Sequence, residues 1–420
     1  MAFELNAWTV LLGVAWGCVL LWLVAAAVSL CALRRQQPLE ALAGERLKGT
    51  DAPLVSILVP ARNEEHRVLE RAVRSMLAQD YGSLEIIAVN DRSTDATGPI
   101  LRSIALDDAR LRVVEGAEPP AGWLGKPHAL QQALKASRGE WVLATDADMI
   151  FAPRALRTVV ALALERRYDA VTLLPHIICL SFWERVFMPA FGWFMLMVLP
   201  LERANNPRRP EALGVGGFFL IRRAALERVG GYRAVQSEVV EDLRMAEILK
   251  ETGASIRAEY APALAATRMQ TNLPEIWEGF TKNLFGGAKF SALQTFAGIL
   301  AVLLFSIAPP FVALACALLL LATGRADFWS QLLVPTFLVW LLQVCIFAFV
   351  NRAWSIPARY ALTVPLGHAL FIAILTNSAL RILYGSGVTW KGRKLYERAG
   401  VRPPRGRGWT PTPDLPSDDE

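Results

Sequence analysis

The sequence predicts an α/β domain with a mostly parallel sheet, together with one N-terminal and about three C-terminal transmembrane helices. Hydrophobic residues make up 54% and charged residues 20% of the 420 residues, which is too apolar for a purely soluble protein of this length. The apolar residues gather near the two ends of the chain. Between them, strand-like and helix-like segments alternate, which is typical of a parallel sheet covered by helices on both faces.

The segment 7–33 holds no charged residue over 27 positions, more than the ~20 residues with which a helix crosses a bilayer. No basic segment precedes it, and Arg34 and Arg35 follow it at once. A cleaved signal peptide has a shorter core and a basic start, so we expect a retained anchor over residues 1–35. The two arginines place its C-terminal end in the cytosol.

Between about residues 49 and 290 the composition is that of a cytosolic domain. Expected buried strands lie at 54–59, 84–89, 112–114 and 141–145, and expected helices lie at 64–79, from 94 onward and at 126–137. Ligands of such sheets bind beyond the carboxyl ends of the strands, which is where the polar clusters of this sequence fall.

The segment 177–200 is apolar, but Glu184 and Arg185 interrupt it. Two charges at the centre of a bilayer would cost roughly 5–7 kcal/mol, so we expect an amphipathic helix that lies on the membrane surface. The segment 273–290 is expected to be interfacial as well.

A second apolar block, 293–384, divides at 324–327 and 351–359, which predicts spans near 294–322, 330–350 and 360–384. Pro309 and Pro310 should break the first span, and Pro365 should bend the third. With the N-terminus outside, four spans would leave the tail 385–420 outside too. Yet that tail is strongly basic before it turns acidic, which favours the cytosol. Either one block is a re-entrant or interfacial hairpin, or two passes lie in the proline-broken stretch; we favour a cytosolic, partly disordered tail.

The net charge of +6 comes largely from the flanks of these spans. We interpret it as attraction to anionic lipid head groups, and we expect no nucleic-acid partner. The five cysteines form no C-x-x-C pair and the four histidines are scattered, so the sequence predicts neither a disulfide framework nor a zinc site.

An acidic pair follows the fourth expected strand. Asp146 and Asp148 stand one residue apart in a turn at the strand's end. Two such carboxylates can hold a hard divalent cation, Mg²⁺ or Mn²⁺, and this cation would neutralise a departing nucleoside diphosphate. A solvated turn is the alternative, because Asp-x-Asp alone is a weak motif. Its position at a strand's carboxyl end favours the metal site.

Other candidate ligands lie at neighbouring strand and helix ends. Asp91 follows the second expected strand and can accept hydrogen bonds from a base or a ribose, whereas Asp95 is better explained as a helix cap. Lys126 lies in a turn just ahead of a helix, where its ammonium group and the helix dipole together suit a diphosphate. A solvated lysine is the alternative there. We expect His128 to be a partly packed helix residue.

The segment 239–243 opens an amphipathic helix with Glu241 and Asp242 in its first turn. Acids in that position usually complement the helix dipole. The functional alternative makes Asp242 the base that removes a proton from an acceptor hydroxyl. Upstream, Gly216 and Gly217 would let a sugar or an acceptor approach the backbone.

The order of these motifs resembles the family 2 glycosyltransferases, which are inverting enzymes with a GT-A-type nucleotide-sugar fold. The similarity covers about residues 54–250 and rests on the motifs as an ordered set. In chain order they are Val59-Pro60-Ala61-Arg62-Asn63-Glu64-Glu65, Asn90-Asp91-Arg92-Ser93-Thr94-Asp95, Gly125-Lys126, Asp146-Ala147-Asp148, Gly216-Gly217 and Glu241-Asp242.

The resemblance implies a role for each matched position. Asp242 would be the general base, Asp91 would contact the nucleoside, and Lys126 would lie by the phosphates. Asp146 and Asp148 would bracket the metal ion, Mg or Mn, and the diphosphate. The other expected donor-binding residues are Pro60, Arg62 and Glu64. The residues expected to line the acceptor are Gly216, Gly217 and Glu241.

Within this family, the layout of anchor, domain and several spans looks like that of ceramide glucosyltransferase-type and hopene-associated bacterial enzymes. The segment 388–393 is similar to a tail motif of that group. Processive polysaccharide synthases carry Q-x-x-R-W after the base, and this sequence departs from that pattern. The segment 277–283 offers Trp277 and Lys282 instead, which either line the site or anchor the chain at the interface. The departure favours a single sugar transfer.

The sequence therefore predicts transfer of one sugar from a nucleoside-diphosphate sugar to a membrane lipid hydroxyl, for example of a hopanoid, at the cytosolic face of a bacterial-type plasma membrane. The segments 177–200 and 273–290 would let the acceptor enter from the bilayer. Rival enzymes are a polyprenyl-phosphate sugar transferase and a processive synthase. A transporter or receptor with a nucleotide-binding domain is the rival from another class, and it would require ionisable residues facing one another inside the spans.

Overall fold

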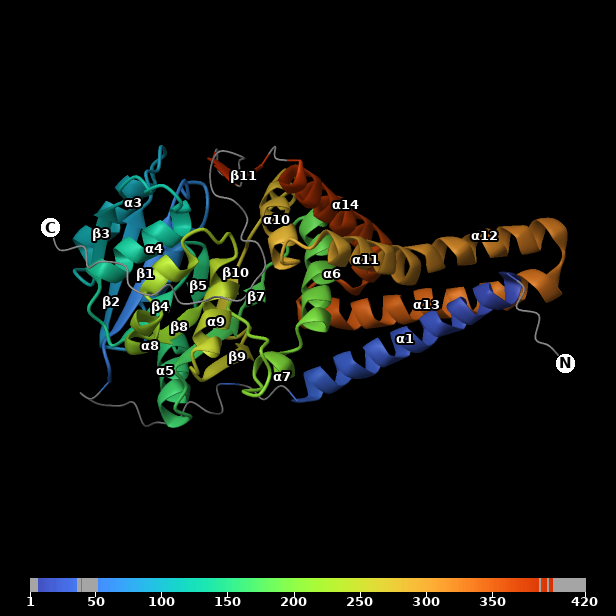
Figure 1. Cartoon of the computed structure of the whole chain (residues 1–420), viewed down its shortest axis with the longest axis horizontal. Coiled ribbons are helices and arrows are strands. Elements are labelled where there is room, and N and C mark those ends of the chain that lie inside the picture. Colours follow the sequence, from blue (N-terminus) through green and yellow to red (C-terminus); the bar gives the residue numbers. More distant parts are fainter. Residues whose placement is uncertain (1–6, 36–38, 40–51, 385–386, 391–392, 396–420) are drawn as a thin grey trace.

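The structure is a computed structural model that describes residues 7–35, 39, 52–384, 387–390 and 393–395. Its main sheet has seven strands in the order β3-β2-β1-β4-β8-β6-β9, all parallel to their neighbours except β8, which is antiparallel to β4 and β6. The strands are β1 (Val55–Ala61), β2 (Leu84–Asn90), β3 (Leu111–Glu115), β4 (Trp141–Ala144), β6 (Ala170–Leu174), β8 (Phe219–Arg222) and β9 (Ile256–Tyr260). The expected mostly parallel α/β sheet is confirmed (Figure 1).

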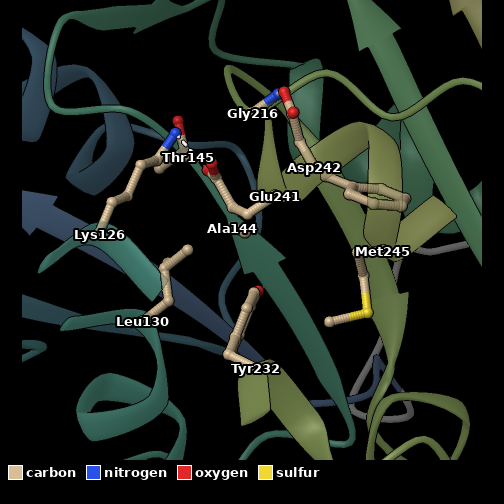
Figure 2. A pocket seen from close by; sticks show the side chains of 10 residues that line it. Lys126, Leu130, Ala144, Thr145, Gly216, Tyr232, Glu241, Asp242 and Met245 are labelled. Atoms are coloured by element: carbon tan, nitrogen blue, oxygen red, sulfur yellow. Dashed lines mark hydrogen bonds and ion pairs between the residues drawn. The ribbon is translucent and has the colours of Figure 1, made fainter. Parts of the chain in front are cut away.

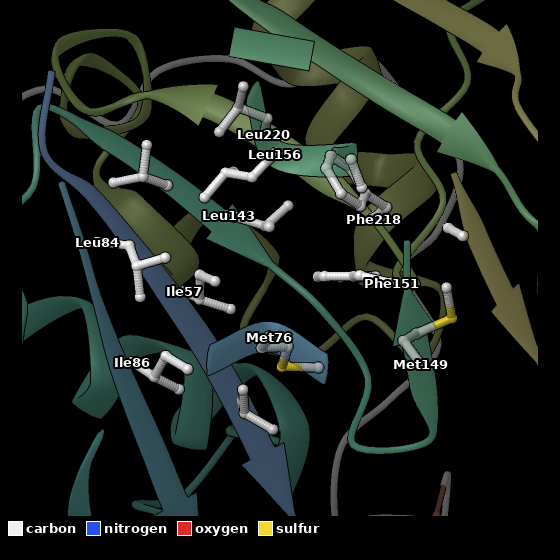
Figure 3. Close-up of a cluster of buried hydrophobic side chains, with 14 of the residues drawn as sticks. Ile57, Met76, Leu84, Ile86, Leu143, Met149, Phe151, Leu156, Phe218 and Leu220 are labelled. Atoms are coloured by element: carbon white, nitrogen blue, oxygen red, sulfur yellow. The ribbon is translucent and has the colours of Figure 1, made fainter. Parts of the chain in front are cut away.

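Alternating residues of the strands feed two cores, one on each face of the sheet. Ile57 packs into the first core, shown in Figure 3, whereas its neighbour Leu58 packs into the second. The first core is covered by α2 (Leu69–Leu77), α3 (Thr97–Asp107) and α5 (Ala155–Glu165). The second is covered by α4 (Gly125–Ala136), α8 (Arg223–Arg228), a 3₁₀ turn (Gly231–Val235) and α9 (Glu241–Glu251).

A smaller sheet, in the order β5-β10-β7, lies beside the main one. It consists of β5 (Met149–Phe151), β7 (His176–Ile177) and β10 (Ala265–Thr267). Because β5 follows the acidic turn directly, this sheet fixes the far end of that turn.

The two expected interfacial segments are helices that start at the domain. Helix α6 (Phe182–Val198) precedes the short α7 (Leu201–Ala204), and α10 (Leu273–Gly287) follows β10. Glu184 is 1% exposed, forms a capping box with Ser181 and pairs with Arg268 at 2.9 Å. Its charge is therefore satisfied at the first turn of α6, against the domain.

Within the described residues, four helices are long and apolar enough to cross a membrane: Ala7–Cys31, Ala292–Thr323, Phe328–Ala353 and Ala358–Leu383. They correspond to α1 (Ala7–Arg35), to α11 (Ala292–Val302) joined with α12 (Ala308–Thr323), to α13 (Ala326–Ala353) and to α14 (Val364–Leu383) with the turn before it. One N-terminal and three C-terminal helices of this kind were expected.

Both proline predictions need correction. Pro309 and Pro310 do not break their span, because a π-helical turn, Leu303–Ile307, carries the helix into α12. Pro365 does not bend a helix either: it stands in the first turn of α14, where proline costs no hydrogen bond.

The two prolines leave two backbone carbonyls without their usual helical hydrogen-bond donors, and side chains of other helices donate to these carbonyls instead. The helical donors for the carbonyls of Phe305 and Ser306 would be residues 309 and 310, and proline has no N–H. Trp22 of α1 donates to the Phe305 carbonyl at 2.7 Å, and Gln343 of α13 donates to the Ser306 carbonyl at 3.0 Å. His368 of α14 lies 2.7 Å from the Ser306 hydroxyl. These buried polar side chains therefore join all four apolar helices at one point.

Helix α14 returns to the domain. Its Ser378 donates to the Thr281 carbonyl of α10 at 2.5 Å, and Val388 of the following strand packs against Phe285 of α10. That strand, β11 (Val388–Trp390), pairs with β12 (Arg393–Leu395). In Figure 1, α1, α12 and α13 extend away from the domain, whereas α14 lies beside α6 and α10.

We expect Trp22→Phe and Gln343→Leu each to lower the stability of the helical bundle by about 0.6–1.7 kcal/mol, because each removes the donor to a proline-orphaned carbonyl. Thermal unfolding of the purified protein in detergent measures the effect. Leu341→Ala, which shortens an exposed side chain on α13, is the matched control. Unchanged unfolding of both variants would contradict this account.

Candidate active site

The carboxyl ends of β1 and β2 join the first two expected motifs. Ala61 and Asn90 are register partners, and Asp91 donates its backbone N–H to the Ala61 carbonyl at 2.8 Å. Arg62 donates to the backbone carbonyl of Asp91 at 2.8 Å. The Asp91 side chain is buried and accepts two hydrogen bonds from Arg92, each of 3.1 Å. The half-buried Pro60 precedes this corner in β1.

The loop after β1 is tied to the start of α3. The N–H of Glu64 donates to the Thr97 hydroxyl at 2.7 Å, and the N–H of Glu65 donates to Asp95 at 3.0 Å. Asp95 also accepts from the N–H of Thr97, the first residue of α3, although the N-cap position is Ala96 and carries no side-chain cap bond. These ties explain why α2 begins at Leu69, five residues later than the sequence predicts.

A single ammonium group joins the acidic turn after β4 to the first turn of α9. The Nζ atom of Lys126 lies 2.7 Å from Oδ1 of Asp146 and 2.6 Å from Oε1 of Glu241. Lys126 reaches them from the first turn of α4, and Figure 2 shows its side chain beside that of Glu241. The side chain of Glu241 is 5% exposed and those of Lys126 and Asp146 about a third or more, so the cluster has one buried and one open side.

Gly216 lies where these groups converge. A Cβ atom at this position would lie 2.9 Å from Nζ of Lys126, 3.1 Å from Oδ2 of Asp242 and 3.5 Å from Oδ2 of Asp146. The N–H of Gly216 donates to Asp242 at 2.5 Å, and the N–H of Leu243 donates to its other oxygen at 2.8 Å. The expected close approach to the backbone at Gly216 is thus made by the protein's own charged groups.

Gly217 has a different surrounding. A Cβ atom there would lie 2.7 Å from the sulfur of Met149, at the start of β5. Its carbonyl accepts a hydrogen bond from the hydroxyl of Thr145 at 2.7 Å. Gly217 therefore lets the acidic turn pack tightly against β8.

The charged groups in this cluster shift one another's pKa values. Burial would lower the pKa of Lys126, but the carboxylates of Asp146, Glu241 and Asp242 outweigh it and raise the pKa well above its usual value. Burial raises the pKa of Asp242, and the negative charge of Glu241 adds to this effect, while Lys126 opposes it. Asp242 thus holds a proton more readily than an ordinary aspartate.

Helix α10 brings a second lysine toward the cluster. Burial and the like charge of Lys126 lower the pKa of Lys282 to about 8. Gly286, one turn further along α10, faces Val240, where a Cβ atom would lie 3.5 Å from Cγ2. Trp277, by contrast, packs among the apolar side chains between α6, α10 and α14. Of the two, only Lys282 is within electrostatic reach of the acids.

Sequence reasoning missed Arg67. Its guanidinium group lies 4.0 Å from Asp148 and 3.2 Å from Glu275 of α10, and it donates to the Met269 carbonyl at 2.5 Å. It thereby links the second acid of the turn to α10. The only signal in the sequence was a basic residue three positions after Glu64, which also describes many solvated helix residues.

The two carboxylates of the acidic turn suit a divalent cation whose coordination shell is completed by oxygen atoms of the substrate. Asp146 faces Lys126, and Asp148 faces Arg67. In this structure the negative charge of the turn is thus balanced by two basic side chains. Within the described ranges, no group of three or more His, Cys, Asp or Glu residues is placed to hold a metal ion. Mg²⁺ commonly takes only one or two carboxylates and completes its shell with phosphate oxygens and water. The donor set fits that case.

His128 packs as expected. Its ring meets the ring of Trp123 edge-on at 5.6 Å and lies 3.1 Å from the amide of Gln132.

The chain is similar to several known proteins. Residues 56–230 match the model of the family described as Glycosyl transferase family 2. The chain is 29% identical over 242 residues to the beta-monoglucosyldiacylglycerol synthase of a Nostoc species, covering 56% of this chain and 49% of the relative. It is 25% identical over 257 residues to the 4,4'-diaponeurosporenoate glycosyltransferase of Staphylococcus aureus, covering 60% of this chain and 67% of that protein. The chain thus spans about half the length of the Nostoc relative.

Among solved structures, the chain is similar to a mannosyltransferase of Pyrobaculum calidifontis in complex with GDP-Man and Mn²⁺. The TM-score is 0.51 at 20% identity, over 82% of this chain and 99% of the other. The likeness shows the fold, which is GT-A-like as the resemblance implied.

We expect Lys126→Met to lower stability by about 1–2 kcal/mol at pH 8, because three carboxylates lose their shared cation. Unpaired acids have raised pKa values in the folded state, so their cost grows as pH rises and shrinks as they take up protons. The loss should therefore be smaller at pH 5, as thermal unfolding at both pH values would show. Lys135→Met, at an exposed position of α4, is the control. An equal loss at both pH values would contradict the ion-pair account.

Proposed function

We propose that this chain, which carries a glycosyltransferase family 2 domain over residues 56–230, transfers one sugar from a nucleoside-diphosphate sugar to the hydroxyl group of a membrane lipid, with inversion. The observation that supports this most is the convergence of Asp146, Lys126 and Asp242 around Gly216. It brings a lysine ammonium group, an acidic turn and a buried aspartate together at one edge of the sheet, as the proposed reaction requires. A domain spanning about 49–290, an anchor over 1–35, a membrane region over 293–384 and a tail over 385–420 complete the organisation that we propose.

The donor would lie across the strand ends. Asp91 and the corner formed by Pro60, Arg62 and Glu64 would bind the nucleoside, and Lys126 would bind the diphosphate. Asp146 and Asp148 would hold Mg²⁺ or Mn²⁺, which neutralises charge on the diphosphate. Lys282 would add a second positive charge from α10.

Asp242 would act as the general base. Its raised pKa suits proton transfer near neutral pH, since a base works best when its pKa is close to the working pH. The acceptor oxygen attacks the anomeric carbon and gives its proton to Asp242. The bond from that carbon to the diphosphate oxygen breaks, and the nucleoside diphosphate leaves with the bonding electrons.

Two features support a lipid acceptor. Lys282 and Glu275 link the site to α10, which packs between the domain and the apolar helices. The names of the two relatives specify products or substrates that are lipids, a glucosyldiacylglycerol and a carotenoid acid. A hopanoid is the acceptor that the resemblance suggests, and polyprenyl phosphate is the rival that needs no base. Trp22 and Gln343, two polar residues of the described spans, donate to proline-orphaned carbonyls, which disfavours the transporter alternative.

We also propose that the domain and the tail lie on the cytosolic side of a bacterial-type plasma membrane. The arginines after α1 support the cytosolic position of the domain. Since α14 packs on α10 and leads into β11 beside it, residues 387–390 share that side, and most of the tail lies outside the described residues. Three helices would then cross the membrane and α14 would be re-entrant, which resolves the conflict between four spans and a basic tail.

The general function is tested by incubating purified protein, Mn²⁺ and membrane lipid extract with a panel of nucleotide sugars. We expect release of one nucleoside diphosphate for each glycolipid formed, and no lengthening of the product with time. Asp146→Ala/Asp148→Ala should abolish the release. If no nucleotide sugar binds or is consumed, the donor assignment is wrong.

Asp242→Asn should lower kcat about 10²–10⁴-fold with a hydroxyl acceptor, since the proton then has no acceptor. In the parent protein kcat/KM should fall as pH drops through the pKa of Asp242, which is raised from 3.8 to about 6, because only the deprotonated carboxylate is a base. Glu247→Gln, on the same helix, is the control. Full activity of Asp242→Asn would favour an acceptor that is already ionised, such as polyprenyl phosphate.

Reporter fusions test the membrane topology. A green fluorescent protein at the C-terminus should fluoresce and alkaline phosphatase there should be inactive, because the tail is cytosolic. Alkaline phosphatase inserted at 324–327, between α12 and α13, should be active. Phosphatase activity at the C-terminus would overturn the re-entrant position of α14.

A further inference from the structure

A small cavity lies behind the ion-paired acids, between α4, the end of β4, the 3₁₀ turn Gly231–Val235 and α9 (Figure 2). Its polar lining comes from Lys126, Thr145, Tyr232, Glu241 and Asp242. The rest of the lining is mainly apolar, with Leu130, Ala144, Phe219 and Met245. It leaves about 10 Å³ for the centre of a water-sized sphere, close to what one water molecule requires.

The hydroxyl group of Tyr232 has no hydrogen-bond partner among the residues that the structure describes. The side chain is 2% exposed, and its hydroxyl points toward Ala144 and Glu241 (Figure 2). Burial and the charge of Glu241 raise the pKa of Tyr232, so the hydroxyl stays protonated and can donate. Buried hydroxyl groups in folded proteins are nearly always hydrogen-bonded, often to ordered water.

The carboxylate of Glu241 can accept a hydrogen bond from such a water molecule. Its Oε1 atom pairs with Lys126 at 2.6 Å, and the described part of the chain supplies its side chain with no other hydrogen bond. Thr145 lines the same cavity and donates its hydroxyl proton to the Gly217 carbonyl, which leaves its lone pairs able to accept. A water molecule in the cavity would thus find one donor and two acceptors, within the two to four polar partners that buried water requires.

We propose that the cavity binds one water molecule, which accepts a hydrogen bond from Tyr232 and donates to Glu241 and Thr145. Tyr232 is then a positioning residue that acts through this water on Glu241 and on the first turn of α9. The role in turnover rests on the proposed function, whereas the water site itself does not.

Glu241 needs a second hydrogen-bonding partner because Lys126, with which it forms an ion pair, is shared with other groups. Its ammonium is shared among Asp146, Glu241 and, in the proposed reaction, the diphosphate. When the diphosphate draws the ammonium toward the open side of the cluster, Glu241 loses part of the ion pair that Lys126 makes with it, while the charge of Lys282 still acts on it. The hydrogen bonds from the water molecule remain, because they come from the closed side. Asp242, the next residue of the same turn, consequently keeps its place.

Tyr232→Phe tests the role in turnover, because it removes only the hydroxyl group. We expect kcat to fall about five- to tenfold, the loss of roughly one hydrogen bond, with the KM for the donor changed less than about twofold. Tyr81→Phe is the matched control: that buried hydroxyl donates to the Pro53 carbonyl on the other side of the sheet, so its loss should lower stability and leave kcat unchanged. A Tyr232→Phe enzyme with the parent kcat would overturn the positioning role.

A double-mutant cycle that combines Tyr232→Phe with Glu241→Gln tests whether Tyr232 acts through Glu241. If Tyr232 acts through Glu241, the two substitutions should be non-additive in kcat. Additive losses would mean that Tyr232 acts elsewhere.

The water site is tested separately, in an experimental structure of the full chain in detergent at a resolution that shows ordered water. Density within hydrogen-bond distance of Tyr232 Oη and Glu241 is expected in the parent protein and should weaken in Tyr232→Phe. A dry cavity in the parent would overturn the inference even if the enzyme transfers sugar. A hydrated cavity in a protein that consumes no nucleotide sugar would instead sustain the water site and refute the proposed function.

Discussion

The ammonium of Lys126, held between Asp146 and Glu241, is the interaction on which the arrangement of the site depends. Asp146, Glu241 and Asp242 come from two segments nearly 100 residues apart, and without a shared cation their like charges would repel one another. The acids nonetheless stay close because α4 aims its first turn at the edge where β4 ends. Gly216 completes the arrangement, since any side chain there would enter the space that the charged groups share.

A different constraint governs the apolar half of the molecule. Two adjacent prolines remove two backbone donors from the second apolar segment, and a carbonyl without a donor is costly where water is scarce. Trp22 and Gln343 supply the missing hydrogen bonds from helices that are remote in sequence. Polar residues in apolar helices are often taken as parts of a transport path. Here their partners explain them as part of the packing of four helices around one irregular turn.

Much of the fold could be predicted from the sequence because it is encoded locally. Short apolar runs ending in polar clusters specified β1, β2 and β4, and the acids before the apolar stripe of α9 located its start. Arg67 and Tyr232 could not be found that way, since their importance comes from partners on distant segments and no motif surrounds them. The direction of α14 was beyond reach for a similar reason: hydropathy measures whether a helix can cross a bilayer, and only its contacts with α6 and α10 show where it ends.

The apolar cluster shared by α6, α10 and α14 joins the sheet domain to the apolar helices. Phe187, Phe280 and Phe371 come from these three helices and belong to one core, with the domain on one side of it and the long helices on the other. A shortened chain that ended after the sheet domain would bare half of this core to water and tend to aggregate. The side of the candidate site that carries Lys282 and Glu275 is therefore held by α10, which itself packs against the apolar helices.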